Sequence, residues 1–137
     1  MEELTGQDLY RFRNAVYNPD RTEALALLAE NPAILEVRSG IGETVLHVVA
    51  VENEQEVIAW LLAHGANIDT VNDFGETPLM DAACLEYTDL CRFLLANGAN
   101  ASFVSASGNS ALSQAARKNN LPLVQLFLTQ LSPQEDI

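Results

Sequence analysis

Apolar residues recur at helical spacing in the segment 72–104, which predicts two successive helices. The first helix would carry one apolar face, formed by Leu79 and by Ala82 and Ala83, which follow it by three and four residues. A polar break spans residues 86–88, and a second apolar face follows, made of Leu90, Phe93, Leu94 and Leu95. We therefore expect a helix, a turn and a second helix with both faces in the core, Leu95 included.

Residues that favour helix ends flank these two apolar faces. The hydroxyl of Thr77 can cap the first helix, and Pro78 suits the first helical position because its missing N–H is not needed there. Gly98 can adopt the left-handed conformation that commonly ends a helix. The first helix should begin at Pro78, and the second should end just before Gly98.

The same pattern repeats every 33 residues along the chain. Three sets of equivalent positions carry it: Gly42, Gly75 and Gly108; Thr44, Thr77 and Ser110; Leu46, Leu79 and Leu112. A fixed period of this length indicates a stacked repeat array, because one copy cannot bury both of its apolar faces alone. We predict a single domain over residues 1–137, with copies at 1–38, 39–71, 72–104 and 105–131 and a fraying tail at 132–137.

Three short motifs within the repeat resemble the ankyrin repeat: GETPL at 75–79, DAA at 81–83 and LLANGAN at 94–100. The resemblance implies an all-α ankyrin-repeat solenoid of about four stacked helix-turn-helix repeats with short β-hairpin-like fingers. The outer two copies would act as caps. It also implies that His47, at the position of the family's recurrent histidine, forms hydrogen bonds in the loops between repeats.

The second and third copies depart from the ankyrin pattern at two positions. Val45 replaces the usual proline, and we expect it to begin a helix nonetheless. Glu86 stands where glycine is favoured between the two helices, so a left-handed conformation there would cost roughly 1 kcal/mol. Asn53 and Asn119, at the same phase, tolerate that conformation better. Trp60 falls on the second helix of its copy and should lie in the core or at its edge.

The first copy matches the pattern weakly, as expected of a terminal cap. Thr5 and Asp20 are predicted to cap its two helices, Asp20 in a capping box with Glu23. Asn31, before Pro32, should end the second helix in the left-handed conformation. A terminal repeat also needs a solvent-facing side, which we expect to be covered by Arg11, Arg13, Arg21 and Glu23.

Composition narrows the class of partner. The chain is 48% hydrophobic and carries 19 acidic against 7 basic residues, a net charge of −12. Such a field repels nucleic acids and anionic membranes and attracts basic proteins, although it could also serve solubility alone. The N-terminal residues lack an apolar stretch typical of a secretory signal, so we expect a cytoplasmic protein.

Candidate chemistry is sparse. The glycines do not form a phosphate-binding loop, and the metal-ligand candidates His47, His64, Cys84 and Cys91 lack the paired spacing of zinc sites. We therefore predict no cofactor, no metal and no catalytic residues. The enzymatic alternative is a nucleophile pair of Cys84 and His47 on adjacent repeats, but the sequence supplies no third group to orient it.

The ankyrin resemblance implies a concave face built from the fingers and first helices. Carried over to this chain, the variable positions on that face that we predict to bind a protein are Ile41, Glu43, Val48, Val51, Glu52, Asp73, Phe74, Glu76, Asp81, Leu85, Asn109, Arg117 and Lys118. The face is expected to be apolar in its centre, acidic around it and basic at one end. Alternatively, some of the apolar side chains pack against the neighbouring finger.

Together these features predict a non-catalytic protein-binding module that is monomeric when free. Its partner would be a protein with a basic surface, bound through the concave face. The module could act as a scaffold or adaptor, or as an inhibitor that masks a basic active site in the manner of an immunity protein. A structural subunit of a larger complex is a further alternative, which a second apolar patch on the convex side would favour.

Overall fold

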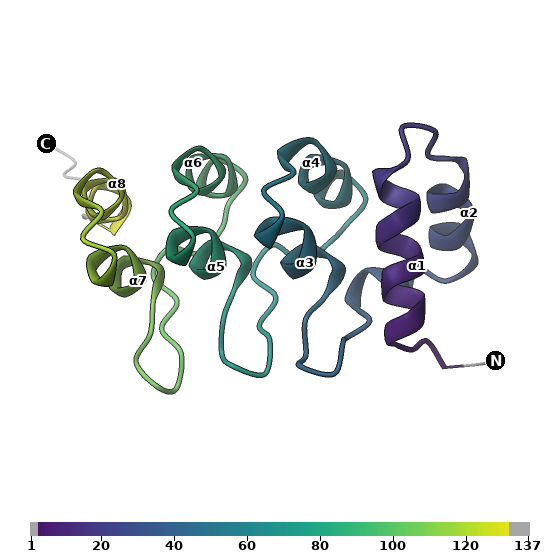
Figure 1. Ribbon diagram of the computed structural model, residues 1–137, viewed down its shortest axis with the longest axis horizontal. Helices are drawn as coiled ribbons and strands as arrows, with labels where there is room; N and C mark the ends of the chain where they lie inside the picture. Colours follow the sequence, from purple (N-terminus) through teal and green to yellow (C-terminus); the bar gives the residue numbers. More distant parts are fainter. Residues whose placement is uncertain (1–2, 132–137) are drawn as a thin grey trace, which may run out of the picture.

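The computed structural model describes residues 3–131, which form a row of helix pairs joined by long loops (Figure 1). The tail predicted at residues 132–137 lies outside the described part. The row is an all-α solenoid, as the repeat pattern predicts. The elements are α1 (Gly6–Tyr17), α2 (Thr22–Glu30), the 3-10 helix η1 (Pro32–Glu36), α3 (Val45–Val51), α4 (Gln55–Ala63), α5 (Pro78–Cys84), α6 (Thr88–Ala96), α7 (Ala111–Arg117) and α8 (Leu121–Leu131).

The ends of the helices follow from the residues that recur every 33 positions. The Thr77 hydroxyl accepts a hydrogen bond from the Met80 N–H at 3.2 Å, and α5 begins at Pro78. The Ser110 hydroxyl accepts from the Ser113 N–H at 3.1 Å at the start of α7. These bonds satisfy N–H groups that have no partner inside the helix. Val45 begins α3 without the proline.

Left-handed residues separate the two helices of each later pair. Asn53, Glu86 and Asn119 have φ angles of 59°, 61° and 54°, so the predicted strain at Glu86 is present. Gly98 follows α6 with a φ of 94°, as expected of a helix-ending glycine. The chain therefore reverses at the same phase in each copy.

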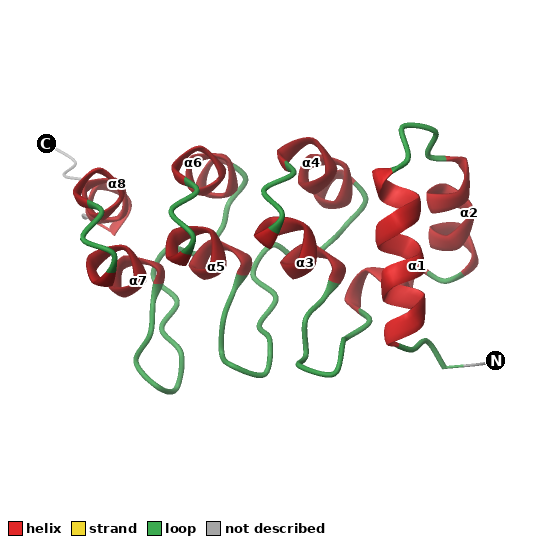
Figure 2. Ribbon diagram, in the orientation of Figure 1, coloured by secondary structure: helices red, strands yellow, loops and turns green. Residues whose placement is uncertain are grey.

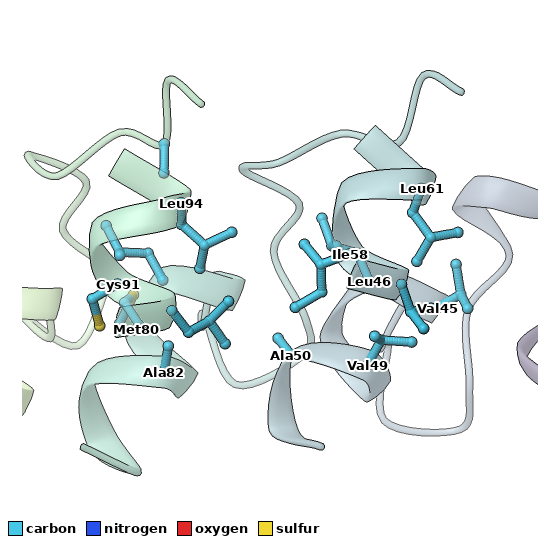
Figure 3. Close-up of a cluster of buried hydrophobic side chains, with 14 of the residues drawn as sticks. Val45, Leu46, Val49, Ala50, Ile58, Leu61, Met80, Ala82, Cys91 and Leu94 are labelled. Carbon is cyan, nitrogen blue, oxygen red and sulfur yellow. The ribbon is translucent and has the colours of Figure 1, made fainter. Parts of the chain in front are cut away.

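The core runs continuously through the stack. Figure 3 shows Leu46 and Ile58 of one pair and Met80 and Leu94 of the next as parts of it, and all four are at most 2% exposed. Alanines such as Ala82 let the inner helices α3, α5 and α7 pack closely side by side.

The predicted apolar face of α6 is buried unequally, because Phe93 and Leu95 are only partly buried. Leu94 is fully buried, whereas Leu95 is only partly buried against the core. Consecutive helical residues point about 100° apart, so both side chains cannot face the same neighbour.

The first pair departs most from the repeat. Helix α1 has 12 residues, against 7 in α3, and Figure 1 shows it lengthwise where α3, α5 and α7 are seen nearly end-on. Thr5 caps α1 as predicted, through a capping box with Asp8.

Two cap predictions for the first pair need correction. The Asp20 carboxylate accepts from the Thr22 N–H at 3.1 Å, but its expected partner Glu23 instead pairs with Arg11. Asn31 is extended, with a φ of −152°, and its side chain accepts from the Ala33 N–H to start η1. The 3-10 turn thus replaces the left-handed ending that Asn31 was expected to provide.

Charged groups join the first pair to the second instead of only covering its outer side. Arg21 forms an ion pair with Glu56 at 2.8 Å and donates to the Val16 carbonyl at 2.6 Å. The Arg21 guanidinium lies 5.5 Å from the centre of the Trp60 ring. Trp60 itself is half-buried and packs against the core, as predicted.

The fingers are loops closed by tight turns. In the second and third copies, the N–H of Ser39 donates to the Glu43 carbonyl at 2.9 Å, and that of Asn72 to the Glu76 carbonyl at 3.0 Å. These bonds resemble a hairpin closure, but the described residues contain no strand (Figure 2). Gly42, with a φ of 78°, lies against the Asp73 backbone, where any Cβ would collide.

Candidate protein-binding face

The fingers and the inner helices present one face of the solenoid. Figure 1 shows the fingers projecting from the row α3, α5 and α7, on the side away from the outer helices. Four predicted apolar residues are exposed on these elements: Phe74 by 63%, Ile41 by 46%, Leu85 by 43% and Val51 by 41%. Apolar side chains that lie together in water on one face are typical of interaction sites.

These four residues form two groups, which we call the finger group (Ile41, Phe74) and the helix-end group (Val51, Leu85). The finger group is held together by the Asp73 N–H, which donates to the Ile41 carbonyl at 3.0 Å. Val51 ends α3, and Leu85 follows the last residue of the neighbouring helix α5. Phe74 also borders an open groove between the third and fourth fingers, with Ser105 and Ala106 on its other side.

The acidic residues predicted on this face have different places along each copy. Glu43 and Glu76 lie where each finger meets its helix, and Asp81 lies midway along α5, between the finger group and the helix-end group. Val48, at the phase of Asp81 in the preceding copy, is half-buried and packs against the core. Along each copy, Glu43, Glu76 and Asp81 thus lie between the finger group and the helix-end group, whereas Asp73 lies beside Phe74.

Asp81 is the most buried carboxylate on this face, with 8% of its surface exposed. Burial raises its pKa to about 8, and the neighbouring charges of Glu76 and Glu43 add to the shift. Burial and the charge of Glu76 also raise the pKa of Glu43. The three carboxylates therefore influence one another, and Asp81 holds its proton at neutral pH.

The position of Glu76 is set by polar contacts on both its backbone and its side chain. Asn72 donates to the Glu76 carboxylate at 3.1 Å, and the Asn72 side-chain oxygen accepts the Glu76 N–H at 3.0 Å. The Glu76 carbonyl accepts from Nε2 of His47 at 2.8 Å. This finger is consequently a rigid support for the acidic residues.

His47 has the structural role that the resemblance implies. Its Nδ1 accepts from the Thr44 N–H at 3.2 Å, so the ring proton is on Nε2 and bonds to the next repeat. Burial lowers the pKa of His47, and the Glu76 carbonyl only partly opposes that shift. Because both ring nitrogens are engaged, His47 is not available as a base for the half-buried Cys84.

Glu52 differs from the other predicted site residues. It forms an ion pair with Arg13 and accepts a hydrogen bond from the Tyr17 hydroxyl at 2.9 Å. Burial raises the pKa of Tyr17, and the hydrogen bond to the Glu52 carboxylate adds to the shift. Glu52 thus joins the first repeat to the second, and only a search for charge pairs across copies could have distinguished it from the other predicted acidic positions.

At the basic end of the face, one of the two predicted basic side chains is held by a hydrogen bond within the protein. Arg117 donates to the side chain of Asn109 at 2.6 Å, which links the end of α7 to the fourth finger. Lys118 is exposed beside it. Asp73 is exposed on the third finger, next to Phe74.

Other kinds of site have less support in the structure. Between residues 3 and 131, no group of three histidine, cysteine or acidic side chains is arranged to hold a metal ion. Over the same range, no helix is long and apolar enough to cross a membrane. Burial raises the pKa of the Cys91 thiol to about 12, which keeps it protonated and unreactive.

The outer side of the solenoid carries one feature that sequence reasoning missed. An open, largely apolar groove runs between α4 and α6, lined by Leu62, Ala66, Ile68 and Phe93 among others. Of these residues, sequence analysis placed only Phe93 on a core-facing side, because periodicity alone does not show how closely neighbouring outer helices pack.

Comparison with curated proteins finds no match, whereas comparison with protein-family models agrees with this architecture. The family model for ankyrin repeats (3 copies) matches residues 12–105, from within α1 to the start of the fourth finger. The chain therefore belongs to the ankyrin-repeat family, whose repeats are generally protein–protein interaction modules.

Proposed function

We propose that this protein binds a partner protein with a basic surface through its concave face, without catalysing a reaction. The observation that carries this proposal is the arrangement of Glu43, Glu76 and Asp81 between two groups of exposed apolar side chains. An interface needs desolvated apolar anchors, and complementary charge selects the partner. Both are present here on one face.

The bulk charge supports the same partner. A net charge of −12 attracts a basic protein over a distance set by ionic strength, and this accelerates association. The apolar groups mainly set how long the complex lasts. Repulsion between copies of the same acidic face also supports a free protein that is monomeric.

Two roles fit such binding. As a scaffold or adaptor, the protein would hold its partner without changing the partner's activity. As an inhibitor of the immunity type, it would cover a basic active site. Activity assays of the captured partner with and without this protein distinguish the two roles.

A structural-subunit role is favoured by a different observation, the apolar groove between α4 and α6. In that role the outer side would be buried in a larger assembly. Residues such as Leu62 and Phe93, and not the concave residues, would then be required for capture.

The test is affinity capture from the native cell with matched variants. Wild type is compared with the double variant Phe74→Ala/Leu85→Ala and with Arg92→Ala, a control on the exposed side of α6. We expect a basic protein that wild type and Arg92→Ala retain and the double variant loses. Equal capture by all three, combined with loss on Leu62→Ser, would refute concave-face binding in favour of the structural subunit.

A further inference from the structure

We propose that the groove between the third and fourth fingers holds an extended backbone segment of the basic partner. The third finger is the turn closed by Asn72 and Glu76. The fourth finger is closed by the Ser105 N–H, which donates to the Asn109 carbonyl at 2.8 Å. Figure 1 shows the two fingers as neighbouring loops before α5 and α7. The inference rests on the proposed function and deepens it, because it states where on this face the partner chain lies and in which conformation.

The groove lies between one large side chain and several small residues. Phe74, which is 63% exposed, and Gly75 border it on the third finger. Ser105, Ala106 and Ser107 border it on the fourth. The two fingers are also in contact, because a Cβ added at Gly75 would lie 2.9 Å from the Cβ of Ser105. The groove is therefore open to an incoming chain, and contact between the fingers supports it.

The preceding pair of fingers is joined at the same phase of the repeat. There the Asp73 N–H donates to the Ile41 carbonyl at 3.0 Å, and the Asp73 carboxylate lies against Gly42. Ala106 and Phe74 follow Asp73 and Ile41 by one period of 33 residues. Within the described part of the chain, however, no hydrogen bond joins the Ala106 N–H to the Phe74 carbonyl. Both residues are exposed, so a partner can reach these two backbone groups.

The two backbone groups define the kind of occupant. In an extended chain, the N–H and C=O groups of successive residues point to opposite sides. One residue of the occupant would donate to the Phe74 carbonyl, and its neighbour would accept from the Ala106 N–H. The partner would thus supply the connection that the second and third fingers make directly. Main-chain hydrogen bonds of this kind provide affinity wherever a protein binds an extended peptide.

Charge favours a basic occupant. Among the described residues that border the groove, only Asp73 is charged, and it is exposed next to Phe74. A lysine or arginine of the occupant would pair with the Asp73 carboxylate and lay its apolar stem on the Phe74 ring. The net charge of −12 attracts the same kind of segment.

The experiment is an NMR titration of the intact protein with a short peptide of alternating arginine and valine, blocked at both ends. The same peptide with glutamate in place of arginine is the control probe. We expect saturable shifts of the backbone amides at residues 74, 75, 106 and 107 with the basic peptide only. Ala106→Leu, which fills the groove, should bind at least about tenfold more weakly. Ala106→Ser, the matched small replacement, should bind like wild type, and both variants should fold because Ala106 is exposed.

Two singly N-methylated peptides test the backbone pairing. Methyl groups on two successive central nitrogens remove N–H donors that point to opposite sides of an extended chain. One of these peptides should bind about fivefold more weakly than the parent peptide, and the other should bind like it.

Three results would overturn the inference. They are equal binding of the two methylated peptides, unchanged affinity of Ala106→Leu, and shifts centred on Leu62 and Phe93, which would place the peptide in the outer groove. The capture test with Phe74→Ala/Leu85→Ala is separate from all three. If that double variant still loses the captured protein, concave-face binding holds and only the role of the groove is wrong.

Discussion

His47 on α3 donates a hydrogen bond from Nε2 to the Glu76 carbonyl of the next finger, at 2.8 Å. The same ring accepts the Thr44 N–H through Nδ1. One buried side chain therefore fixes the finger of the following repeat relative to its own helix. The position of Glu76 on the face formed by the fingers and the inner helices depends in part on this contact.

Replacing that histidine should destabilise the stack. His47→Leu leaves the Glu76 carbonyl and the Thr44 N–H without their partner, and should cost about 1–3 kcal/mol of unfolding free energy in urea. Because the pKa of His47 is lowered in the folded state, the unfolded chain binds the proton more readily. Wild type should thus lose stability as pH falls below about 6.5, and His47→Leu should lose less over that window. His64→Leu, on the exposed side, is the control, and an equal effect there would contradict the assignment.

Asp81→Asn should stabilise the protein above neutral pH. The pKa of Asp81 is raised in the folded state, to about 8, so the folded state binds a proton that the unfolded chain has already lost. The stability that protonation confers is complete below about pH 4 and is lost as pH rises to about 8. Removing the charge should add roughly 1–3 kcal/mol at pH 8, and much less at pH 4, in urea unfolding. A variant that is no more stable than wild type at pH 8 would show that Asp81 ionises freely.

Glu86→Gly should also stabilise the fold, by up to about 1 kcal/mol. Glu86 has a φ of 61°, a conformation that glycine adopts without a steric penalty. The gain is reduced by loss of the hydrogen bond from Asn120, at 3.3 Å, and by the greater freedom of glycine in the unfolded chain. Asn53→Gly, with a similar φ, should gain less because asparagine tolerates this region, and thermal unfolding of both variants gives the comparison.

The two leucines near the end of α6 should differ in their contribution to stability. Leu94→Ala removes a fully buried side chain and should cost about 2–5 kcal/mol. Leu95→Ala should cost clearly less, because Leu95 is only partly buried. Chemical denaturation of both variants tests the burial pattern. A larger loss of unfolding free energy for Leu95→Ala would show that Leu95, and not Leu94, faces the core.

Binding kinetics should separate apolar from charged residues of the concave face. Phe74→Ala and Leu85→Ala should each accelerate dissociation of a captured partner and weaken binding by about 1–2 kcal/mol. Asp73→Lys should slow association and reduce its dependence on salt. Surface plasmon resonance at two salt concentrations measures both rates. Unchanged dissociation for both alanine variants would exclude these side chains as anchors.

The division of the chain at residues 38, 71 and 104, and the assignment of individual residues to binding, stay predictions. They rest on the phase of the repeat and on the exposure of the side chains. The capture experiment addresses the binding residues directly.

The repeat pattern and the local chemistry of the sequence were enough to predict the stacked solenoid, the start of α5 at Pro78 and the position between the two helices at which Glu86 is left-handed. Helix caps, turns and apolar periodicity each depend on a few neighbouring residues. Because these residues recur every 33 positions, successive copies form the same local structure. Tertiary packing alone decided that Leu94 and not Leu95 is fully buried and that Glu52 pairs with Arg13. The desolvation of Asp81 likewise depends on how closely neighbouring repeats approach, and that separation is set by contacts between copies that no single copy encodes.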